Sequence, residues 1–202
     1  MSRPIWTTLC MIMIMLILCL TACTSDSAMG EVKRTDSYTL NSERRDLEER
    51  IKNNRDSFQQ TMPEKYKLTA TVNVSHEADG DRINYDVLVN DVQIPLANVI
   101  QSFTLAPAMM NVIDAPDLLN TNTSNDYEIN LEPNNEPLGL SLGRSYILKP
   151  KADIRRSALS DYQNMYIKIS YGSEDERTED YFYIQAEPST EAQAYMESLS
   201  NE

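Results

Sequence analysis

Cysteine is scarce in this 202-residue sequence, and its positions exclude several kinds of site. Cys10, Cys19 and Cys23 are the only three, and none occurs after position 23. A disulfide, a CxxC redox pair and a cysteine-based zinc site each need two or more thiols. Residues 24–202 can form none of them, so their stability must come from a hydrophobic core, which a domain of this size can bury.

Histidine is scarcer still. His76 is the only one, and it stands at the end of a predicted strand, where surface positions are common. The stretch from Gly139 to Gly143 has the spacing GxSxG around Ser141, but its flanks predict strand and turn rather than a strand-to-helix elbow, and no histidine follows. We therefore predict no catalytic residue and no enzymatic activity. A histidine-independent hydrolase, for example one with a Ser–Lys pair, is the remaining alternative.

Basic side chains are outnumbered. The chain has 18 Lys and Arg against 31 Asp and Glu, for a net charge of −13. Such a field repels nucleic acid and anionic polymers, so we expect no nucleic-acid partner. The acidic surplus serves the solubility of a surface protein, or attracts a cationic partner.

A long hydrophobic run is also lacking. The apolar stretch over residues 9–20 is shorter than the about 20 residues that a membrane-crossing helix needs. It follows one basic side chain, Arg3, and ends at small residues. This organisation is typical of a secretory signal peptide.

The sequence Leu20-Thr21-Ala22-Cys23 resembles the lipobox of bacterial lipoproteins, which is an aliphatic residue, two small residues and a cysteine. In that family the thiol receives a diacylglyceryl group and a peptidase cuts before the cysteine. The resemblance implies a signal peptide over residues 1–22 and a lipid anchor on Cys23. Loss of Arg3 then takes the net charge from −13 to −14.

The residue after the cysteine bears on localisation. It is Thr24, not Asp, so the resemblance implies the outer membrane, or the outer face of the cell membrane in a bacterium with one membrane. A signal peptide without lipidation and a short membrane anchor are the alternatives.

Two segments precede the first predicted strand. Residues 23–40 are small and polar, which predicts a flexible tether. Residues 41–62 contain neither Gly nor Pro and predict a helix. Its stripe of Leu47, Ile51 and Phe58 is narrower than that of a core-facing helix. We expect light packing or a stalk, with a coiled-coil interface as the alternative.

The remainder predicts a mainly β domain over residues 63–202. Apolar and polar side chains alternate over residues 66–75 and 83–89, and Asp79-Gly80 between them predicts a hairpin turn. Further candidate strands are residues 99–105, 127–131, 138–142, 146–148, 165–171 and 181–186. Short strands with polar turns predict an antiparallel β-sandwich. Residues 143–185 resemble the last strands of an immunoglobulin-like or fibronectin-type domain.

The chain ends with a predicted short helix. Thr190 and Gln193 have capping-box spacing, and apolar side chains recur on one stripe. The stripe contains Ala192, Tyr195, Met196 and Leu199. We expect this helix to dock on the sandwich, and a partner-facing helix is the alternative.

Two features point to ligand binding. Residues 106–124 form a long connection that contains Met109, Met110, Leu118 and Leu119, which could line an apolar pocket. Aromatic side chains gather on the last two strands, and Tyr181-Phe182-Tyr183 must place aromatics on both faces. One face could offer a tyrosine patch to a peptide or sugar, although cross-strand packing accounts for the same residues.

Acidic residues gather at two turns. Glu77, Asp79 and Asp81 surround the first hairpin turn, and residues 173–180 form the second group. The first lacks EF-hand spacing, and solvated loops account for both, so we expect no metal and no cofactor; weak calcium binding by the second group is the alternative.

Together these features predict a non-enzymatic lipoprotein of the cell envelope that contacts a protein or peptide at the membrane surface. The alternative is a lipoprotein that binds a small ligand or ion in a pocket under residues 106–124. We also expect a fragment over residues 63–202 to unfold cooperatively with a lowered midpoint, because the helix before it contributes only partial burial.

Overall fold

The computed structural model describes residues 39–125 and 127–201. The chain divides into two units, Met1–Val32 and Lys33–Glu202, and all described residues belong to the second. The expected signal peptide, Cys23 and most of the expected tether lie outside the described residues. Within the described part of the chain, no helix is long and apolar enough to cross a membrane.

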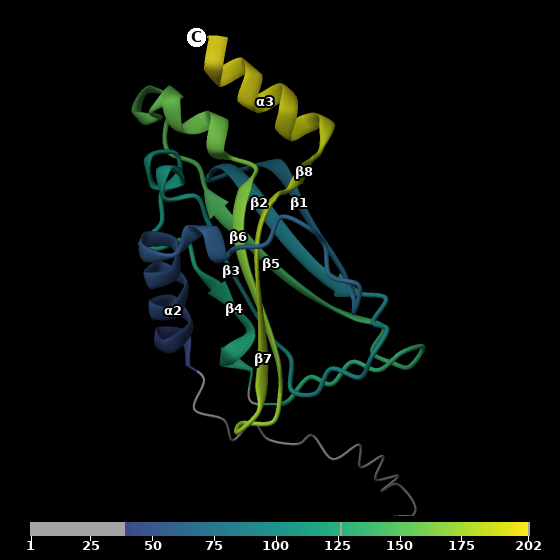
Figure 1. Ribbon diagram of the computed structural model, residues 1–202. Coiled ribbons are helices and arrows are strands. Elements are labelled where there is room, and N and C mark those ends of the chain that lie inside the picture. The colour runs from purple at the N-terminus through teal and green to yellow at the C-terminus, as the bar shows by residue number, and fades with distance from the viewer. Residues whose placement is uncertain (1–38, 126, 202) are drawn as a thin grey trace, which may run out of the picture. The chain divides into compact units, whose positions relative to one another are not determined.

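The described unit is mainly β, with two four-stranded sheets (Figure 1). The first sheet has the order β5-β2-β1-β8, from β1 (Lys67–Glu77), β2 (Gly80–Asn90), β5 (Gly139–Ile147) and β8 (Glu187–Pro188). Strands β1 and β2 pair from Lys67 with Asn90 to Glu77 with Gly80, which confirms the predicted hairpin. Gly80 has φ +140°, a conformation that favours glycine.

The second sheet has the order β4-β3-β6-β7, from β3 (Ile100–Leu105), β4 (Asn120–Thr121), β6 (Asn164–Gly172) and β7 (Arg177–Gln185). The predicted strand over residues 127–131 does not form as a continuous strand: Tyr127 and Leu131 are isolated bridge residues, Leu131 pairing with Leu96, and residues 128–130 lie outside any strand. Asn98 in the adjacent segment has φ +45°, which interrupts the extended backbone that a longer ladder needs. The two strands predicted over residues 138–142 and 146–148 are one strand, β5.

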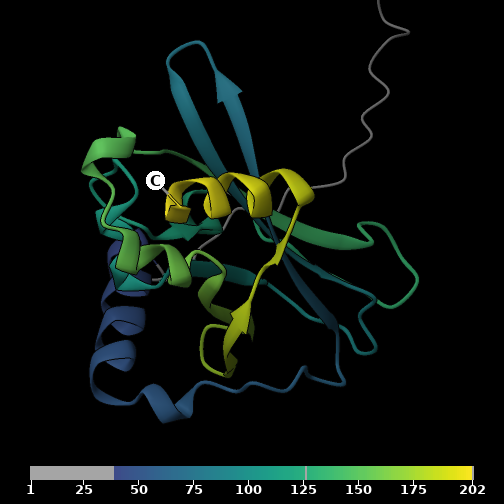
Figure 2. The ribbon, with the colours of Figure 1, turned by 90° about the horizontal axis from the view of Figure 1, so that it is seen from above.

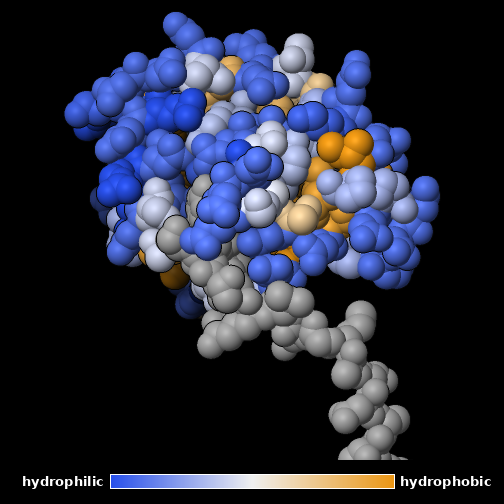
Figure 3. All heavy atoms as spheres, turned by 60° about the horizontal axis from the view of Figure 1, so that its bottom comes forward, coloured by the Kyte–Doolittle hydropathy of each residue, from blue (hydrophilic) through white to orange (hydrophobic). Residues whose placement is uncertain are grey.

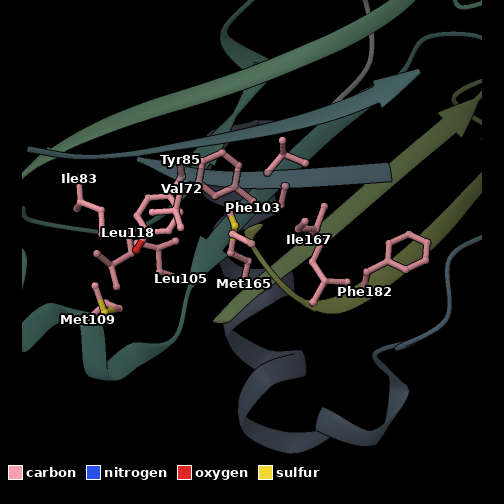
Figure 4. Packing of buried hydrophobic residues seen from close by; sticks show 14 of the residues in the cluster. Val72, Ile83, Tyr85, Phe103, Leu105, Met109, Leu118, Met165, Ile167 and Phe182 are labelled. Atoms are coloured by element: carbon pink, nitrogen blue, oxygen red, sulfur yellow. The ribbon is translucent and has the colours of Figure 1, made fainter. Parts of the chain in front are cut away.

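The main core lies between the sheets, where side chains from both point toward one another (Figure 4). Val72 and Tyr85 of the first sheet and Phe103, Ile167 and Phe182 of the second are almost completely buried. The inward positions of β1 alternate with exposed or half-buried ones, as the sequence predicts. The prediction of a sandwich-like, mainly β fold is therefore confirmed.

The C-terminal helix α3 (Thr190–Asn201) docks across one end of the sheets (Figure 2). Ala192, Met196 and Leu199 are buried in the main core, as predicted. They pack with Ala158 and Leu159 of the short 3₁₀ helix η5 (Arg156–Asp161). The helix therefore closes the end of the core and does not present this stripe to a partner.

The N-terminal helix α2 is shorter than predicted: it covers Leu40–Asn53 rather than residues 41–62. Thr39 and Ser42 cap its start reciprocally, with Oγ1 of Thr39 accepting from the Ser42 amide at 3.2 Å. Asn54 leaves helical geometry, and asparagine has a low helix propensity. The chain then runs through the 3₁₀ turn η1 (Arg55–Ser57) into an extended segment.

Helix α2 does not pack lightly. Leu47, Ile51 and Phe58 are 0 %, 9 % and 6 % exposed, and they form a second core cluster with Tyr166 and Tyr181 of the second sheet. The expected stalk or lightly packed helix is therefore wrong. The apolar stripe is narrow because charged side chains, described below, complete the buried face of the helix.

Candidate binding groove

A groove of about 610 Å³ lies between α2 and the connection that follows β3. Pockets for small molecules are typically about 300–1,000 Å³. One wall is formed by Leu47 and Ile51 of α2, and the other by Met110, Leu118 and Leu119. The pocket predicted beside residues 106–124 therefore exists, although the sequence did not indicate that α2 forms its other wall.

The connection over residues 106–124 is ordered rather than irregular. It contains the 3₁₀ helices η2 (Pro107–Asn111) and η3 (Asn122–Ser124), with β4 between them. The two adjacent methionines lie in different environments: Met109 is fully buried in the main core, whereas Met110 lines the groove and is 39 % exposed. The polypeptide thus offers one flexible apolar side chain at the groove while the rest of the segment is anchored.

Charged side chains surround the apolar side chains of the two walls, which together form the floor of the groove. Arg44, Lys52 and Arg55 line the groove with the acidic residues Glu48 and Asp117. Asp117 is held between two arginines, because Nη2 of Arg44 donates to its Oδ2 at 3.0 Å and Nη1 of Arg144 donates to its Oδ1 at 2.9 Å. Its charge is therefore compensated within the protein.

Two other cations of the rim, unlike Arg44, are not held by a carboxylate of the described residues. Lys52 and Arg55 are exposed, and neither has a carboxylate partner among residues 39–125 and 127–201. The Arg55 guanidinium lies 5.9 Å from the ring centroid of Tyr166. Both groups can therefore approach an anion without breaking an internal ion pair.

A buried charge cluster fixes α2 against the second sheet. Lys168 on β6 is 2 % exposed, and its Nζ lies 3.0 Å from Oε1 of Glu43, 2.8 Å from Oδ2 of Asp46 and 3.0 Å from Oε1 of Glu179. Ser102 Oγ donates to Oε2 of Glu43 at 2.7 Å. Glu43 and Asp46 belong to α2, so the cluster holds the wall of the groove in place.

Two members of the cluster, Lys168 and Asp46, have pKa values shifted in favour of their charged forms. Burial by itself would lower the pKa of Lys168, but the carboxylates of Glu43, Asp46 and Glu179 outweigh it and raise that pKa. Burial would raise the pKa of Asp46, but hydrogen bonds from Lys168 and Tyr181 outweigh it and lower that pKa. Lys168 therefore remains protonated and cannot serve Ser102, which is itself fully buried, as a general base.

Ser141 and His76, the residues considered for catalysis, do not line the groove. Ser141 sits inside β5, opposite Leu88 of β2, and its Oγ donates to Oδ1 of Asp86 at 2.6 Å. His76 pairs with Asp81 near the other end of β2, and its side chain is 71 % exposed. The GxSxG stretch thus lies in a strand, as predicted, and the structure does not bring Ser141 and His76 together.

His76 belongs to a surface network. Its Nδ1 lies 2.6 Å from Oδ1 of Asp81, whose Oδ2 accepts from the hydroxyl of Tyr195 at 2.6 Å. These hydrogen bonds, from Tyr195 first and then His76, lower the pKa of Asp81. The network joins the β1–β2 hairpin to α3, which is a structural role.

The acidic turns have protein partners rather than a metal-site geometry. Asp79 accepts from Arg82 at 2.6 Å, and Asp180 accepts from the Tyr66 hydroxyl at 3.0 Å. Among the residues that the structure describes, no group of three His, Cys, Asp or Glu side chains is arranged to hold a metal ion.

Packing rather than an open patch accounts for most of the aromatics on the last two strands, because the segment after α2 covers part of their outer face. Phe58 packs edge-on against Tyr166 with ring centroids 5.0 Å apart, and the Arg50 guanidinium lies 3.5 Å from the ring centroid of Tyr181. Tyr166 and Tyr181 are consequently buried. Aromatics do occupy both faces of β7, as expected; on the outer face Tyr181 is buried, whereas Tyr183 stays half-buried.

The charged residues of the groove and the cluster carry only weak signals in the sequence. One signal was present: Glu43, Leu47 and Ile51 recur at i, i+4 and i+8, which places the carboxylate on the apolar stripe. A second was Lys168, within a strand whose other residues are mainly apolar or aromatic.

Comparison of the chain with protein-family models, with curated proteins and with solved structures finds no match. Function must therefore be argued from the chemistry of the groove.

Proposed function

We propose that this protein is a non-enzymatic, lipid-anchored lipoprotein of the bacterial cell envelope and that it binds a small ligand in the groove between α2 and residues 107–119. The groove supports this function best, because it combines an apolar floor with a few charged groups at its rim. The lipobox resemblance at Cys23 supports the anchor and an extracytoplasmic location.

Contact with a protein or peptide is the second candidate, and the structure favours it less. An open tyrosine patch would have supported it, but Tyr166 and Tyr181 are buried and Tyr183 is half-buried. The face in Figure 3 is largely hydrophilic, with one compact apolar area. Exposed large apolar side chains include Leu40, Met62, Ile94, Met110, Tyr127 and Leu138. Single exposed apolar residues are common on protein surfaces and by themselves indicate no partner.

The sandwich itself is proposed to be immunoglobulin-like. The order β5-β2-β1-β8 in one sheet and β4-β3-β6-β7 in the other means that the chain changes sheets after β2, after β4, after β5 and after β7. Such crossings between two packed sheets are the Greek-key connections of that architecture. The parallel pairing of β8 with β1 is an addition at the edge.

The anchor is tested by substitution of Cys23. Because the thiol is the proposed lipid acceptor, we expect Cys23→Ala to abolish partition of the protein into Triton X-114 and incorporation of labelled palmitate. Cys19→Ala is the matched control and should behave as wild type. A Cys23→Ala protein that is processed and membrane-bound as before would contradict the anchor.

The groove is tested with a neutral apolar probe. We expect residues 24–202 to enhance the fluorescence of N-phenyl-1-naphthylamine, and Met110→Asp to weaken this binding at least about ten-fold, because a carboxylate at the apolar wall costs about 1.4 kcal/mol or more when the probe covers it. Leu138→Asp is the matched control, since Leu138 is 62 % exposed and does not line the groove. Equal loss of binding in both variants, or none in either, would contradict the groove as the site.

A further inference from the structure

The groove is locally basic in a strongly acidic chain. Arg44, Lys52 and Arg55 line it against Glu48 and Asp117, and Asp117 is already compensated by two arginines. From this charge distribution we infer that the ligand is a single-chain anionic amphiphile, with a carboxylate or phosphate head at the rim and an alkyl chain on the floor. This inference rests on the proposed function and specifies its ligand class.

The rim supplies donors for an anionic head. Nη2 of Arg44 is already engaged with Asp117, so the donors free for a ligand come from Lys52 and Arg55. Lys52 stands in the last turn of α2, where the helix dipole interacts favourably with a cation. Arginine and lysine together are the usual ligands of carboxylates and phosphates.

The floor fits an alkyl chain. Leu47, Ile51, Leu105 and Leu118 are buried side chains that line the groove, and Met110 adds a flexible thioether at its wall. The groove residues from Arg44 to Arg55 span about 16 Å along the chain, at the helical rise of about 1.5 Å per residue. An elongated apolar ligand can therefore lie along α2 with its head group at a basic side chain.

A single molecule suits this site better than the surface of a bilayer. The expected mature chain carries a net charge of −14, which repels an anionic bilayer. The cations of the groove act over a much shorter range and only on a ligand that enters it. We therefore assign the site to a monomeric amphiphile.

Four probes with the same twelve-carbon chain test the inference. Residues 24–202 are titrated by calorimetry with dodecanoate, dodecyl phosphate, dodecanol and dodecyltrimethylammonium, each below its micelle concentration. The methyl resonance of Met110 reports whether a probe enters the groove. We expect both anions to bind at least about ten-fold more tightly than dodecanol, because their charged heads accept charge-assisted hydrogen bonds, and the cation to bind most weakly.

Two variants locate the head group. Lys52→Gln combined with Arg55→Gln should remove most of the preference for the anions and leave the affinity for dodecanol unchanged. Arg45→Gln is the matched control, because Arg45 is an exposed cation of α2 that does not line the groove. It should leave all four affinities as in wild type.

The outcomes separate the ligand class from the site. If dodecanol or the cation binds as tightly as the anions, or if the double variant retains the preference, the assignment of an anionic ligand is wrong. The groove would still be the binding site. If no probe shifts the Met110 resonance and N-phenyl-1-naphthylamine also fails to bind, the proposed function itself is wrong. Binding to phosphatidylglycerol vesicles without binding of the monomeric anions would overturn the inference in favour of a membrane surface.

Discussion

Lys168→Met is expected to lower the free energy of unfolding by about 3–5 kcal/mol, the usual cost of removing one partner of a buried ion pair. For a domain of this size that corresponds to a fall of about 6–20 °C in the thermal midpoint. The ammonium group is 2 % exposed and contacts Glu43, Asp46 and Glu179. Its removal leaves the fully buried carboxylate of Glu43 without a cation.

Two comparisons isolate this effect. Lys67→Met removes an exposed lysine of β1 and should change the midpoint little. Adding Glu43→Gln to Lys168→Met removes the stranded charge but keeps an acceptor for Ser102, so the double variant should be more stable than the sum of the two single changes predicts. Thermal or urea unfolding gives all these values. A Lys168→Met protein as stable as wild type would show that the cluster does not hold α2.

The pH dependence gives an independent readout of the same cluster. The pKa of Asp46 is lower in the folded protein than in the unfolded chain. The ionised form therefore contributes stability above the unfolded value of about 3.9, and this contribution is lost as the pH falls through the folded pKa. Lys168→Met removes one main cause of the lowered pKa, so its loss of stability in acid should begin at a higher pH than in wild type.

A fragment over residues 63–202 is expected to lose cooperative unfolding and to aggregate. The sequence alone predicted a folded fragment with a lowered midpoint, but the structure shows that Leu47, Ile51 and Phe58 are buried. Full burial of these three contributes about 5–9 kcal/mol, and loss of Glu43 and Asp46 strands Lys168 at about 3–5 kcal/mol more. A domain's net stability is only about 5–15 kcal/mol.

The matched fragment starts at residue 33 and keeps α2. It should unfold with the midpoint of the mature chain, because all described elements lie within Lys33–Glu202. Circular dichroism and light scattering distinguish the two fragments. If the shorter one unfolds in a single transition only slightly below the longer one, α2 is dispensable and the original domain boundary at residue 63 is correct.

These two results bear on the groove as well. Glu43, Leu47 and Ile51 lie on one helix, and the last two line the groove while the first binds Lys168. A change that releases α2 from the second sheet therefore removes a wall of the ligand site. Variants of the cluster should be compared with groove variants only where both remain folded.

Local features of the fold were determined by the sequence alone. Alternation over β1 and β2, with a glycine at the turn, specifies a hairpin because side-chain direction and turn geometry depend on adjacent residues. The apolar stripe of α3 likewise indicates a helix that needs cover, and its three buried residues are those of the stripe. A pocket beside residues 106–124 was also anticipated, since methionine and leucine gather there.

The tertiary structure alone decided where α2 packs and what it covers. Glu43 and Lys168 are 125 positions apart in the sequence, and neither residue indicates a partner at that distance. Charged side chains are seldom fully buried unless they are paired, and Glu43 and Lys168 are buried as an ion pair. The same packing buries Tyr166 and Tyr181 and forms the groove. The sequence could not indicate α2 as a wall of this groove, because a cavity between two distant segments leaves no periodic pattern in either of them.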